Sequence, residues 1–431
     1  MFKKVGFVVI ASVVTGLVLG LVLSLGAFGG GTEAETMGSA LVALGTGFLL
    51  LALASRRSTQ PQGWALGPGV GASAAGLALF VAAPGDRGMH ALGWVWPVLL
   101  AALVARSFLG ARGSLQSWTR RAVLYPALAV LLVVALAGAF ETVASATTAN
   151  AAPGGRTYLV NGHRLYLDCA GSGAPTVVLF NGLGERTPSW AWVERELAPT
   201  TRVCVFDRAG EGWSGAGVGR QDGLELAADA HALLRTAGVR GPYVLAGHSV
   251  GGTYALVYAE RYPAEVAGVA LIDSSSPYQF DLPGYPRFYS LFRRGTSLLP
   301  SVARSGLGRL TLGSGTDVLP ARAARSARLF AQSPRELRAD HDDVLELPTV
   351  FRQAQALRSL GGKPLAVVSA GVGQQRGWPG AQARLARLSR NSVHITVPGA
   401  THEGLLLEER YATTAARAIE GVVRFARSGR R

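Results

Sequence analysis

A serine flanked by glycines lies near the middle of the chain, in the stretch LAGHSVGGTYAL. Residues Gly247 to Gly251 fit the pattern G-x-S-x-G, in which small residues allow a tight turn that exposes the serine hydroxyl. A hydroxyl is a poor nucleophile until a base takes its proton, so nucleophilic chemistry at Ser249 requires a histidine and a carboxylate nearby. The alternative is a glycine-rich bend in which Ser249 has only a structural role.

His402 is the histidine that the sequence favours as this base. It lies in PGATHEGL, after the last predicted strand, and the chain order serine, acid, histidine is the one found with this type of turn. His248 directly precedes the serine, and we expect its side chain to point away from the turn. His394 is expected inside a strand, packed against a helix. The remaining histidines have less suitable positions, at His90, His163, His231 and His341.

The carboxylate is harder to place, because no Asp or Glu occurs between Gly371 and Ala383, after the seventh predicted strand. Asp273 ends the sixth strand, in VALIDSSSP, and could hold the His402 tautomer and stabilise the imidazolium. Its alternative role is a cap that accepts hydrogen bonds from nearby backbone amides. Asp281 and the DHDD cluster at 340–343 are weaker candidates, because they lie in cap-like sequence.

A parallel sheet would bring these residues together, and the sequence from Arg156 onward predicts one. Apolar runs rich in β-branched residues alternate with helical patterns such as SWAWVERELA, which is typical of an α/β domain. RTYLV and HRLYLDCA, joined by Asn161-Gly162, predict a hairpin, and about eight strands are expected in all. Ser249 then follows a strand at 243–246 and precedes a helix at 252–262, the setting in which G-x-S-x-G presents a nucleophile.

In this setting, residues 156 to about 427 resemble the α/β-hydrolase superfamily, serine hydrolase type. The matching stretches are GHSVGG, NGLGE after the third strand, DRAGEGWS after the fourth, and PGATHEGL near the end. The resemblance implies an α/β-hydrolase fold, with a mostly parallel eight-stranded sheet, flanking helices and a helical cap. It is silent about the substrate.

The same resemblance implies roles for individual residues. It favours a triad of Ser249, Asp273 and His402, and an oxyanion hole made by the backbone N–H groups of Leu183 and Val250. It also implies that Asp207 and Arg208, in the turn after the fourth strand, are architectural.

A cap is expected at about 276–347, where the alternation of strands and helices is interrupted. It is rich in aromatic residues, namely Tyr278, Phe280, Tyr285, Phe288, Tyr289 and Phe292. These side chains could line an apolar pocket for an ester or amide with an apolar acyl or alcohol part. They could equally fill the core of the cap.

Five apolar segments precede this domain, and each approaches the roughly 20 residues needed to cross a hydrocarbon core. They cover about 5–28, 38–55, 65–83, 89–105 and 122–144. The third is the weakest, because it is rich in glycine and contains Pro68. The first is too long for the apolar core of a signal peptide, and more spans follow it. Ionisable residues are nearly absent inside the segments, which favours an anchor over a transporter.

The charges between these segments predict an orientation. Basic residues lie before the first segment, after the second, and around the loop before the fifth. They are Lys3, Lys4, Arg56, Arg57, Arg106, Arg112, Arg120 and Arg121. The other loops hold Glu33, Glu35 and Asp86, with Arg87 as their only basic residue. Because an excess of Lys and Arg marks the cytoplasmic side, we predict a multi-pass protein of the cell membrane with an extracytoplasmic C-terminal domain.

The predicted domains are a transmembrane helical region at 1–145, a linker at 146–155 and the α/β-hydrolase domain at 156–431. The linker, in ASATTANAAPGG, is small, polar and turn-prone. Ala144-Ser145-Ala146 also resembles a cleavage site, so retention and removal of the anchor both stay open. The net charge of +15 is read as a solvated basic surface, because no nucleic-acid-binding module is evident.

The chain has two cysteines, Cys169 and Cys204, in the second and fourth predicted strands. Those strands are neighbours in the fold that the chain resembles, so a disulfide is possible, and an extracytoplasmic domain would preserve it. Two buried free thiols are the alternative. No Cys and His spacing typical of a metal site is present, and no cofactor is expected.

These patterns together predict a membrane-anchored serine hydrolase that cleaves a small-molecule or lipid-like ester or amide through an acyl-enzyme. A non-catalytic binding or assembly protein on the same scaffold is the alternative from another class. A cofactor-free acyltransferase or peroxidase with the same triad is a third reading.

Overall fold

The computed structural model describes residues 5–27, 29–115, 118, 120–148, 154–217, 221–308, 317–331 and 333–429. The chain forms two compact units. The helical unit comprises Met1–Thr148, Leu291–Gly313 and Gln332–Arg338, and the sheet unit comprises Ala149–Ser290, Ser314–Ala331 and Ala339–Arg431. Lys3, Lys4 and linker residues 149–153, on which predictions above depend, lie outside the described residues.

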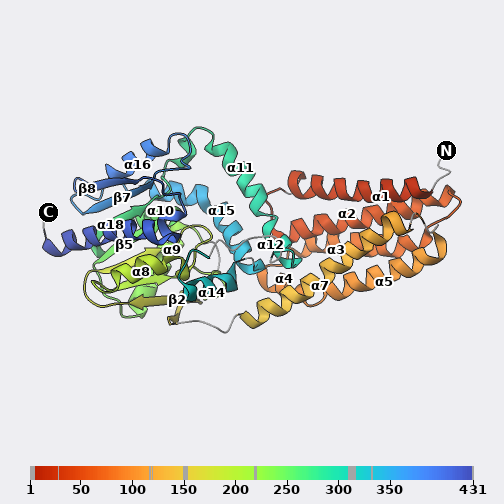
Figure 1. Ribbon diagram of the computed structural model, residues 1–431, viewed down its shortest axis with the longest axis horizontal. Helices are drawn as coiled ribbons and strands as arrows, with labels where there is room; N and C mark the ends of the chain where they lie inside the picture. The colour runs from red at the N-terminus through yellow and green to blue at the C-terminus, as the bar shows by residue number, and fades with distance from the viewer. Residues whose placement is uncertain are drawn as a thin grey trace. The chain divides into compact units, whose positions relative to one another are not determined.

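Long apolar runs form the helices of the helical unit, and a helix pairs its own backbone N–H and C=O groups, as a segment that crosses a membrane must. Figure 1 shows these helices running alongside one another. The helices before the linker are α1 (Val5–Leu21), α2 (Glu33–Ala54), α3 (Leu66–Ala82), α4 (Asp86–Gly93), α5 (Trp96–Ser114) and α7 (Tyr125–Thr148). Short π or 3₁₀ turns lie at Val22–Ala27, Ser55–Arg57, Gly63–Ala65 and Arg120–Leu124.

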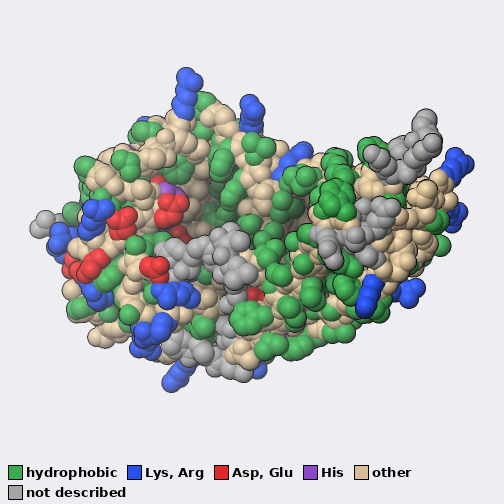
Figure 2. Space-filling view, turned by 45° about the vertical axis from the view of Figure 1, so that its right-hand side comes forward, with side chains coloured by type: hydrophobic (Ala, Val, Ile, Leu, Met, Phe, Trp, Pro, Cys, Tyr) green, Lys and Arg blue, Asp and Glu red, His purple; other side chains and the backbone are tan. Residues whose placement is uncertain are grey.

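Four helical stretches are long and apolar enough to cross a membrane: Val5–Ala27, Glu33–Arg57, Gly63–Ala82 and Ala122–Thr147. Helices α4 and α5 form a fifth candidate only as a pair, because they meet at a bend of 45°. The glycine-rich third segment, which the sequence marks as the weakest, is therefore a continuous helix, and the fourth is the broken one. Many apolar side chains here are exposed, among them Leu17 and Leu136, and Figure 2 shows hydrophobic side chains gathered over this unit.

Close packing between α2 and α3 explains why the glycine-rich segment is helical. A Cβ added at Gly76 would lie 2.7 Å from the carbonyl oxygen of Gly38, and one at Gly45 would lie 2.2 Å from Ser73 Oγ. Small residues let two helix backbones approach to this distance. Pro68 is tolerated because it lies in the first turn of α3, where its missing N–H has no intrahelical partner to lose.

A buried ion pair ties a short helix from the predicted cap, α12 (Leu299–Arg304), into the helical unit. Arg304 Nη2 donates to Glu33 Oε2 at 3.0 Å, and Arg304 Nη1 donates to the carbonyl oxygen of Met89 at 3.0 Å. Arg304 Nε also contacts Glu33. Both charged side chains are almost fully buried. Residues 299–304 therefore lie at the end of the bundle where α2 begins.

The sheet unit is built on eight strands, in the order β1-β2-β4-β3-β5-β6-β7-β8. Strands β3 to β8 pair in parallel, whereas β1 with β2 and β2 with β4 pair antiparallel. Their bounds are β1 (Arg156–Val160), β2 (His163–Ala170), β3 (Thr176–Phe180), β4 (Val203–Phe206), β5 (Tyr243–His248), β6 (Val266–Ile272), β7 (Leu365–Ala370) and β8 (Ser392–Val397). The predicted α/β fold with an eight-stranded, mostly parallel sheet is confirmed.

Helices cover both faces of this sheet, as Figure 1 shows. One face packs against α9 (Gly223–Thr236), α10 (Val250–Arg261) and α16 (Trp378–Ala386), and the other against α8 (Ala191–Leu197), α17 (Gly404–Leu407) and α18 (Glu409–Ser428). Both faces of β3 and β5 are therefore buried, which is why these strands read as continuous apolar runs. The other helices are α11 (Tyr285–Thr296), α14 (Ala321–Phe330) and α15 (Pro334–Ala354). Short 3₁₀ turns lie at Thr187–Trp190, Pro263–Glu265 and Gln279–Asp281.

The hairpin at the start of the sheet has the expected turn. Val160 pairs with His163, and the two residues between them have positive φ angles, 46° at Asn161 and 87° at Gly162. Asn-Gly suits such a turn because both residues tolerate the left-handed region. One strand further along the sheet, Cys169 pairs with Cys204, and the two sulfurs are joined in a disulfide.

Candidate active site

Ser249 lies in a sharp turn between β5 and α10. Its φ of 54° and ψ of −129° are unusual for a residue with a side chain, a strain that is often found at functional positions. A Cβ added at Gly251 would lie 2.1 Å from the carbonyl oxygen of Phe180, so this position requires glycine. Ser249 N donates to the carbonyl oxygen of Ile272 at 3.1 Å, and Ser249 O accepts from Ser275 N at 2.9 Å. The turn is thus held against the strand that carries the candidate acid.

Asp273 directly follows β6, and the structure brings its carboxylate to His402. Asp273 Oδ2 lies 2.7 Å from His402 Nδ1. Asp273 Oδ1 accepts from Trp378 Nε1 at 2.9 Å and from the backbone N–H of Ala370 at 3.0 Å. The two roles considered for Asp273 therefore coincide, because one oxygen caps backbone and indole groups while the other faces the histidine.

These hydrogen bonds keep Asp273 ionised although it is 1% exposed. Burial alone would raise the pKa of this carboxyl, but the hydrogen bond and charge of His402, with the bonds from Trp378 and Ala370, outweigh burial and lower the pKa. A carboxylate at this point is an acceptor, so it holds the Nδ1–H tautomer of His402. Nε2 is then the ring nitrogen able to take a proton.

His402 lies in the loop between β8 and α17, and its side chain is 34% exposed. Its ring centroid lies 4.5 Å from that of His248, the residue before Ser249. Its carbonyl oxygen accepts from His248 Nε2 at 2.9 Å. Because His248 and Ser249 are adjacent in the chain, these contacts hold His402 beside the nucleophile turn.

The loop after β3 carries Leu183, and it also approaches Ser249. A Cβ added at Gly182 would lie 3.0 Å from Ser249 Cβ. Val250 is the first residue of α10, and the first N–H groups of a helix have no intrahelical acceptor. Backbone N–H groups at these two positions suit the stabilisation of a developing oxyanion.

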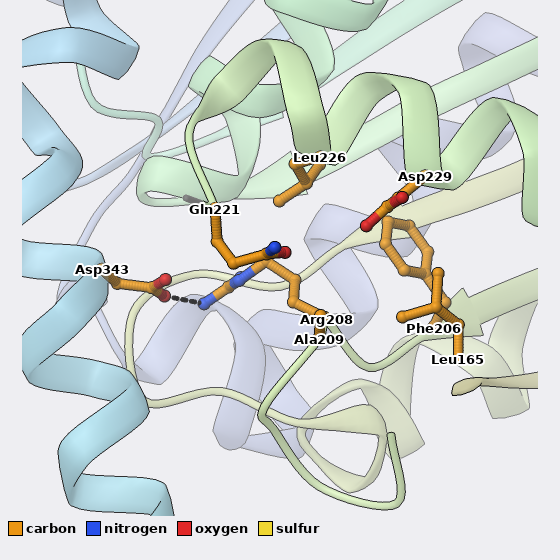
Figure 3. Close-up of a pocket in the computed structure, with 8 residues that line it drawn as sticks. All are labelled: Leu165, Phe206, Arg208, Ala209, Gln221, Leu226, Asp229 and Asp343. Atoms are coloured by element: carbon orange, nitrogen blue, oxygen red, sulfur yellow. Dashed lines mark hydrogen bonds and ion pairs between the residues drawn. The ribbon is translucent and has the colours of Figure 1, made fainter. Parts of the chain in front are cut away.

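Asp207 and Arg208, which follow β4, hold the loop after β3 in place through hydrogen bonds. Asp207 Oδ1 accepts from Thr187 N at 2.8 Å, and Arg208 Nη1 donates to the carbonyl oxygen of Asn181 at 2.6 Å. Both side chains are almost fully buried. Arg208 also pairs with Asp343, a contact that Figure 3 shows at a small pocket lined by Leu165, Phe206, Arg208, Ala209, Gln221, Leu226, Asp229 and Asp343. Neither Ser249 nor His402 lines this pocket.

Two histidines, His248 and His394, lie differently from expectation, and the weaker acid candidate Asp281 lies outside the candidate site. His248 does not point away from the site, because it lies between His402 and Glu185. His394 is exposed and bonds Ser369 Oγ at 2.8 Å, since its strand is at the edge of the sheet. Asp281 is exposed on a 3₁₀ turn.

Glu185 is the site residue that the sequence reasoning missed. It is the last letter of NGLGE, the stretch that carries the predicted oxyanion loop, so its position in the motif was the available signal. A carboxylate three residues after a loop amide can fold back onto it, but its second partner, His248, lies 63 residues further along the chain, at the end of the neighbouring strand β5. Only the sheet brings those two together.

Several of the cap aromatics pack against one another. The ring of Phe280 lies 5.1 Å from Tyr285, 5.0 Å from Tyr289 and 5.8 Å from Phe351. Tyr285 is buried, whereas Phe288 is 53% exposed. For Phe280, Tyr285 and Tyr289, the observed packing therefore favours the core of the cap over a pocket lining.

Comparison with known proteins agrees with this geometry. A family model described as the alpha/beta hydrolase fold matches residues 175–407. An uncharacterised protein of Schizosaccharomyces pombe is 31% identical over 228 residues, which cover 50% of this chain and 41% of the relative. An AB hydrolase superfamily protein of Gibberella zeae is 32% identical over 105 residues, 23% of this chain and 33% of the relative. The matches thus span less than half the length of either relative.

A solved structure extends the likeness to the fold. The Cif epoxide hydrolase from Acinetobacter nosocomialis superimposes with a TM-score of 0.54 at 15% identity, over 67% of this chain and 96% of that one. A superposition at such low identity indicates a shared architecture and carries no argument about chemistry. With more than half of its length matched by the family model, the chain belongs to the α/β-hydrolase family.

Proposed function

We propose that this protein is a membrane-anchored serine hydrolase that cleaves an ester or amide through an acyl-enzyme. The observation that carries the proposal is the 2.7 Å contact between Asp273 Oδ2 and His402 Nδ1, beside a serine in a strained turn. Nucleophile, base and orienting acid come from the ends of three strands, β5, β8 and β6, at the carboxyl edge of the parallel sheet. This is where ligands bind in open α/β sheets.

In the proposed reaction, Ser249 Oγ attacks the carbonyl carbon while its proton passes to His402 Nε2. Asp273 stabilises the imidazolium that forms, and the N–H groups of Leu183 and Val250 stabilise the oxyanion of the tetrahedral intermediate. Collapse breaks the bond to the alcohol or amine, which takes the proton from His402. Water then attacks the acyl group on Ser249, with His402 as base, and the carboxylic acid leaves.

The anchor is proposed to be the helical unit, with the sheet unit outside the cytoplasm. The support is the length and apolar surface of its helices, and a disulfide that persists in oxidising compartments. A hydrolase anchored in a bilayer meets lipid-like esters at high local concentration. Lipid-like or other apolar esters are therefore the substrate class to screen first.

A fluorophosphonate probe tests the nucleophile directly, because it phosphonylates a serine only when a base activates it. We expect the wild-type protein to be labelled and Ser249→Ala to lose both labelling and esterase activity with an unchanged melting temperature. Ser359→Ala, at an exposed serine outside the site, is the matched control and should be labelled like the wild type. A folded Ser249→Ala protein with wild-type turnover contradicts the mechanism, and an unlabelled wild type favours a non-catalytic binding protein.

A further inference from the structure

Glu185, which is partly buried, and the buried His248 form a pair beside the candidate triad. His248 Nδ1 contacts Glu185 Oε1, and His248 is 1% exposed. The second oxygen, Glu185 Oε2, accepts from the backbone N–H of Gly182 at 2.6 Å. On the other side of the ring, His248 Nε2 lies 2.9 Å from the carbonyl oxygen of His402. One continuous chain of hydrogen bonds therefore runs from Gly182 to His402.

This chain connects the three loops that the proposed mechanism depends on. Gly182 precedes Leu183 in the predicted oxyanion loop, His248 precedes Ser249, and His402 is the predicted base. The three loops follow β3, β5 and β8. Strands β3 and β5 are neighbours, whereas β8 lies at the edge of the sheet beyond β6 and β7, so strand pairing alone does not fix the base loop against the other two. Displacements of about 1 Å in an active site can lower a rate by on the order of 10²-fold.

The partners of His248 also require a particular protonation state. A carbonyl oxygen and an ionised carboxylate are both acceptors, whereas a neutral imidazole has only one N–H to donate. With Glu185 ionised, both bonds are made at once only when the ring carries two protons, as an imidazolium paired with the Glu185 carboxylate. The charged and titratable groups that face the ring are Glu185 from the loop after β3, Asp273 from the loop after β6, and His402 from the loop after β8.

The surroundings of the ring agree with that state. Burial alone would lower the pKa of His248, but the charge and hydrogen bond of Glu185, the carbonyl of His402 and the charge of Asp273 outweigh burial and raise the pKa. A raised pKa means that the interaction is complete at low pH and is lost as the pH rises through the folded value.

We infer that the Glu185–His248 ion pair positions the oxyanion loop and the base around Ser249, and that activity falls when His248 loses its proton. The inference rests on the proposed serine hydrolase mechanism. Neither residue is assigned a chemical step, since both act through Gly182 and His402. When the ring is neutral, one of its two bonds is lost, and either the base loop or the oxyanion loop is released.

The distinguishing variant is Glu185→Gln. A glutamine can accept from Gly182 N–H through its oxygen and donate from its amide to a neutral His248 Nδ1, which leaves Nε2–H for His402. All the bonds then exist without a charge on the ring. We therefore expect Glu185→Gln to be labelled at a rate within about threefold of wild type, because no hydrogen bond is lost. Its rate should no longer fall at alkaline pH.

Two truncations each interrupt this chain of hydrogen bonds and should behave differently from Glu185→Gln. Glu185→Ala leaves Gly182 N–H and His248 without the carboxylate, and His248→Leu leaves Glu185 Oε1 and the His402 carbonyl without the histidine donor. We expect each to slow fluorophosphonate labelling by on the order of 10²-fold through misplaced loops. Glu196→Gln, at an exposed glutamate on α8, is the control for the loss of one negative charge and should match wild type.

The experiment measures the second-order labelling rate of the full-length protein in detergent from about pH 5 to pH 10, with melting temperature recorded at each pH. The wild-type rate should fall toward the alkaline end of this range as His248 loses its proton. An unchanged alkaline fall in Glu185→Gln, a wild-type rate that never falls, or truncations within threefold of wild type at matched melting temperature each overturn the inference. Labelling that survives Ser249→Ala would instead contradict the proposed function, so the two failures are distinguishable.

Discussion

Asp273 is the residue whose replacement tests the proposed mechanism most directly, because no carboxylate follows the seventh strand. Residues 371–383 lack Asp and Glu. Asp273 has the required contact with His402, and it comes from the neighbouring strand β6. The proposed acid therefore reaches His402 Nδ1 from the strand next to β7.

Replacement of Asp273 by Asn tests this assignment. An amide can donate to His402 Nδ1 and so favour the wrong tautomer, which costs on the order of 10⁴ in kcat when a triad acid is lost. We expect Asp273→Asn to fold and to lose most of its turnover, with kcat measured on a p-nitrophenyl ester. Because the pKa of Asp273 is lowered in the folded protein, its ionised carboxylate also stabilises the fold at neutral pH, which Asp273→Asn cannot do. This stabilisation is lost as the pH falls through the folded pKa of Asp273.

Two other aspartates serve as controls. Asp207→Asn should lower the melting temperature, because Asp207 is buried and accepts bonds from Thr187. Asp281→Asn, at an exposed position, should leave both kcat and stability unchanged. If Asp273→Asn retains kcat within about tenfold, a barrier change below ~1.4 kcal/mol, while another aspartate variant collapses, the triad is assigned to the wrong acid.

At the scale of single elements, α3 depends on glycine for its packing against α2. Gly76 faces the backbone of α2, whereas a Cβ added at Gly71 would meet nothing within 4 Å. The two positions lie on the same helix and differ in what surrounds them. They therefore separate the effect of helix packing from the intrinsic cost of glycine in a helix.

We expect Gly76→Ala to destabilise the helical unit by about 1–3 kcal/mol, because the added methyl overpacks the interface. Gly71→Ala should be neutral or stabilising by up to about 1 kcal/mol, since alanine is the better helix former. Thermal unfolding in one detergent, followed by circular dichroism, measures both. Equal shifts in the two variants would mean that α2 and α3 do not pack through these glycines.

For the whole molecule, the question is whether the bent pair α4–α5 crosses the membrane. With five crossings the sheet unit lies outside the cytoplasm, and with four it lies inside. The Glu33–Arg304 pair supports five, because it holds residues 299–304 at the end of the bundle where α2 begins. Residues 299–304 follow α7 in the chain, so they reach that end only if an even number of crossings, α2 to α7 with α4–α5 as one, returns the chain to it.

Reporter fusions test this topology. We expect a reporter that is active only outside the cytoplasm to be active when fused at Arg431. A reporter that is active only in the cytoplasm should be active when fused after Arg57, which the charge pattern assigns to the inside. A silent external reporter at Arg431, with the Arg57 fusion active, would mean that α4–α5 is re-entrant. It would also contradict the proposed position of the sheet unit, with its disulfide, outside the cytoplasm.

The sequence alone determined those features that depend on local order along the chain. The G-x-S-x-G turn, the Asn161-Gly162 hairpin and the alternation of apolar strands with amphipathic helices are each contained within a few neighbouring residues. Apolar length alone likewise marked the helices of the first 148 residues. Period and turn chemistry are local properties, so they can be read before the chain is folded.

Only the tertiary structure decided contacts between residues that are distant in the chain. It brought Asp273 to His402 across 129 positions and Glu185 to His248 across 63. It also broke the fourth apolar segment and kept the glycine-rich third one continuous, because the surface of α2 favours glycine there. Which distant residues meet depends on the order of the strands and on which helix faces pack together. Neither property is encoded locally by composition or spacing.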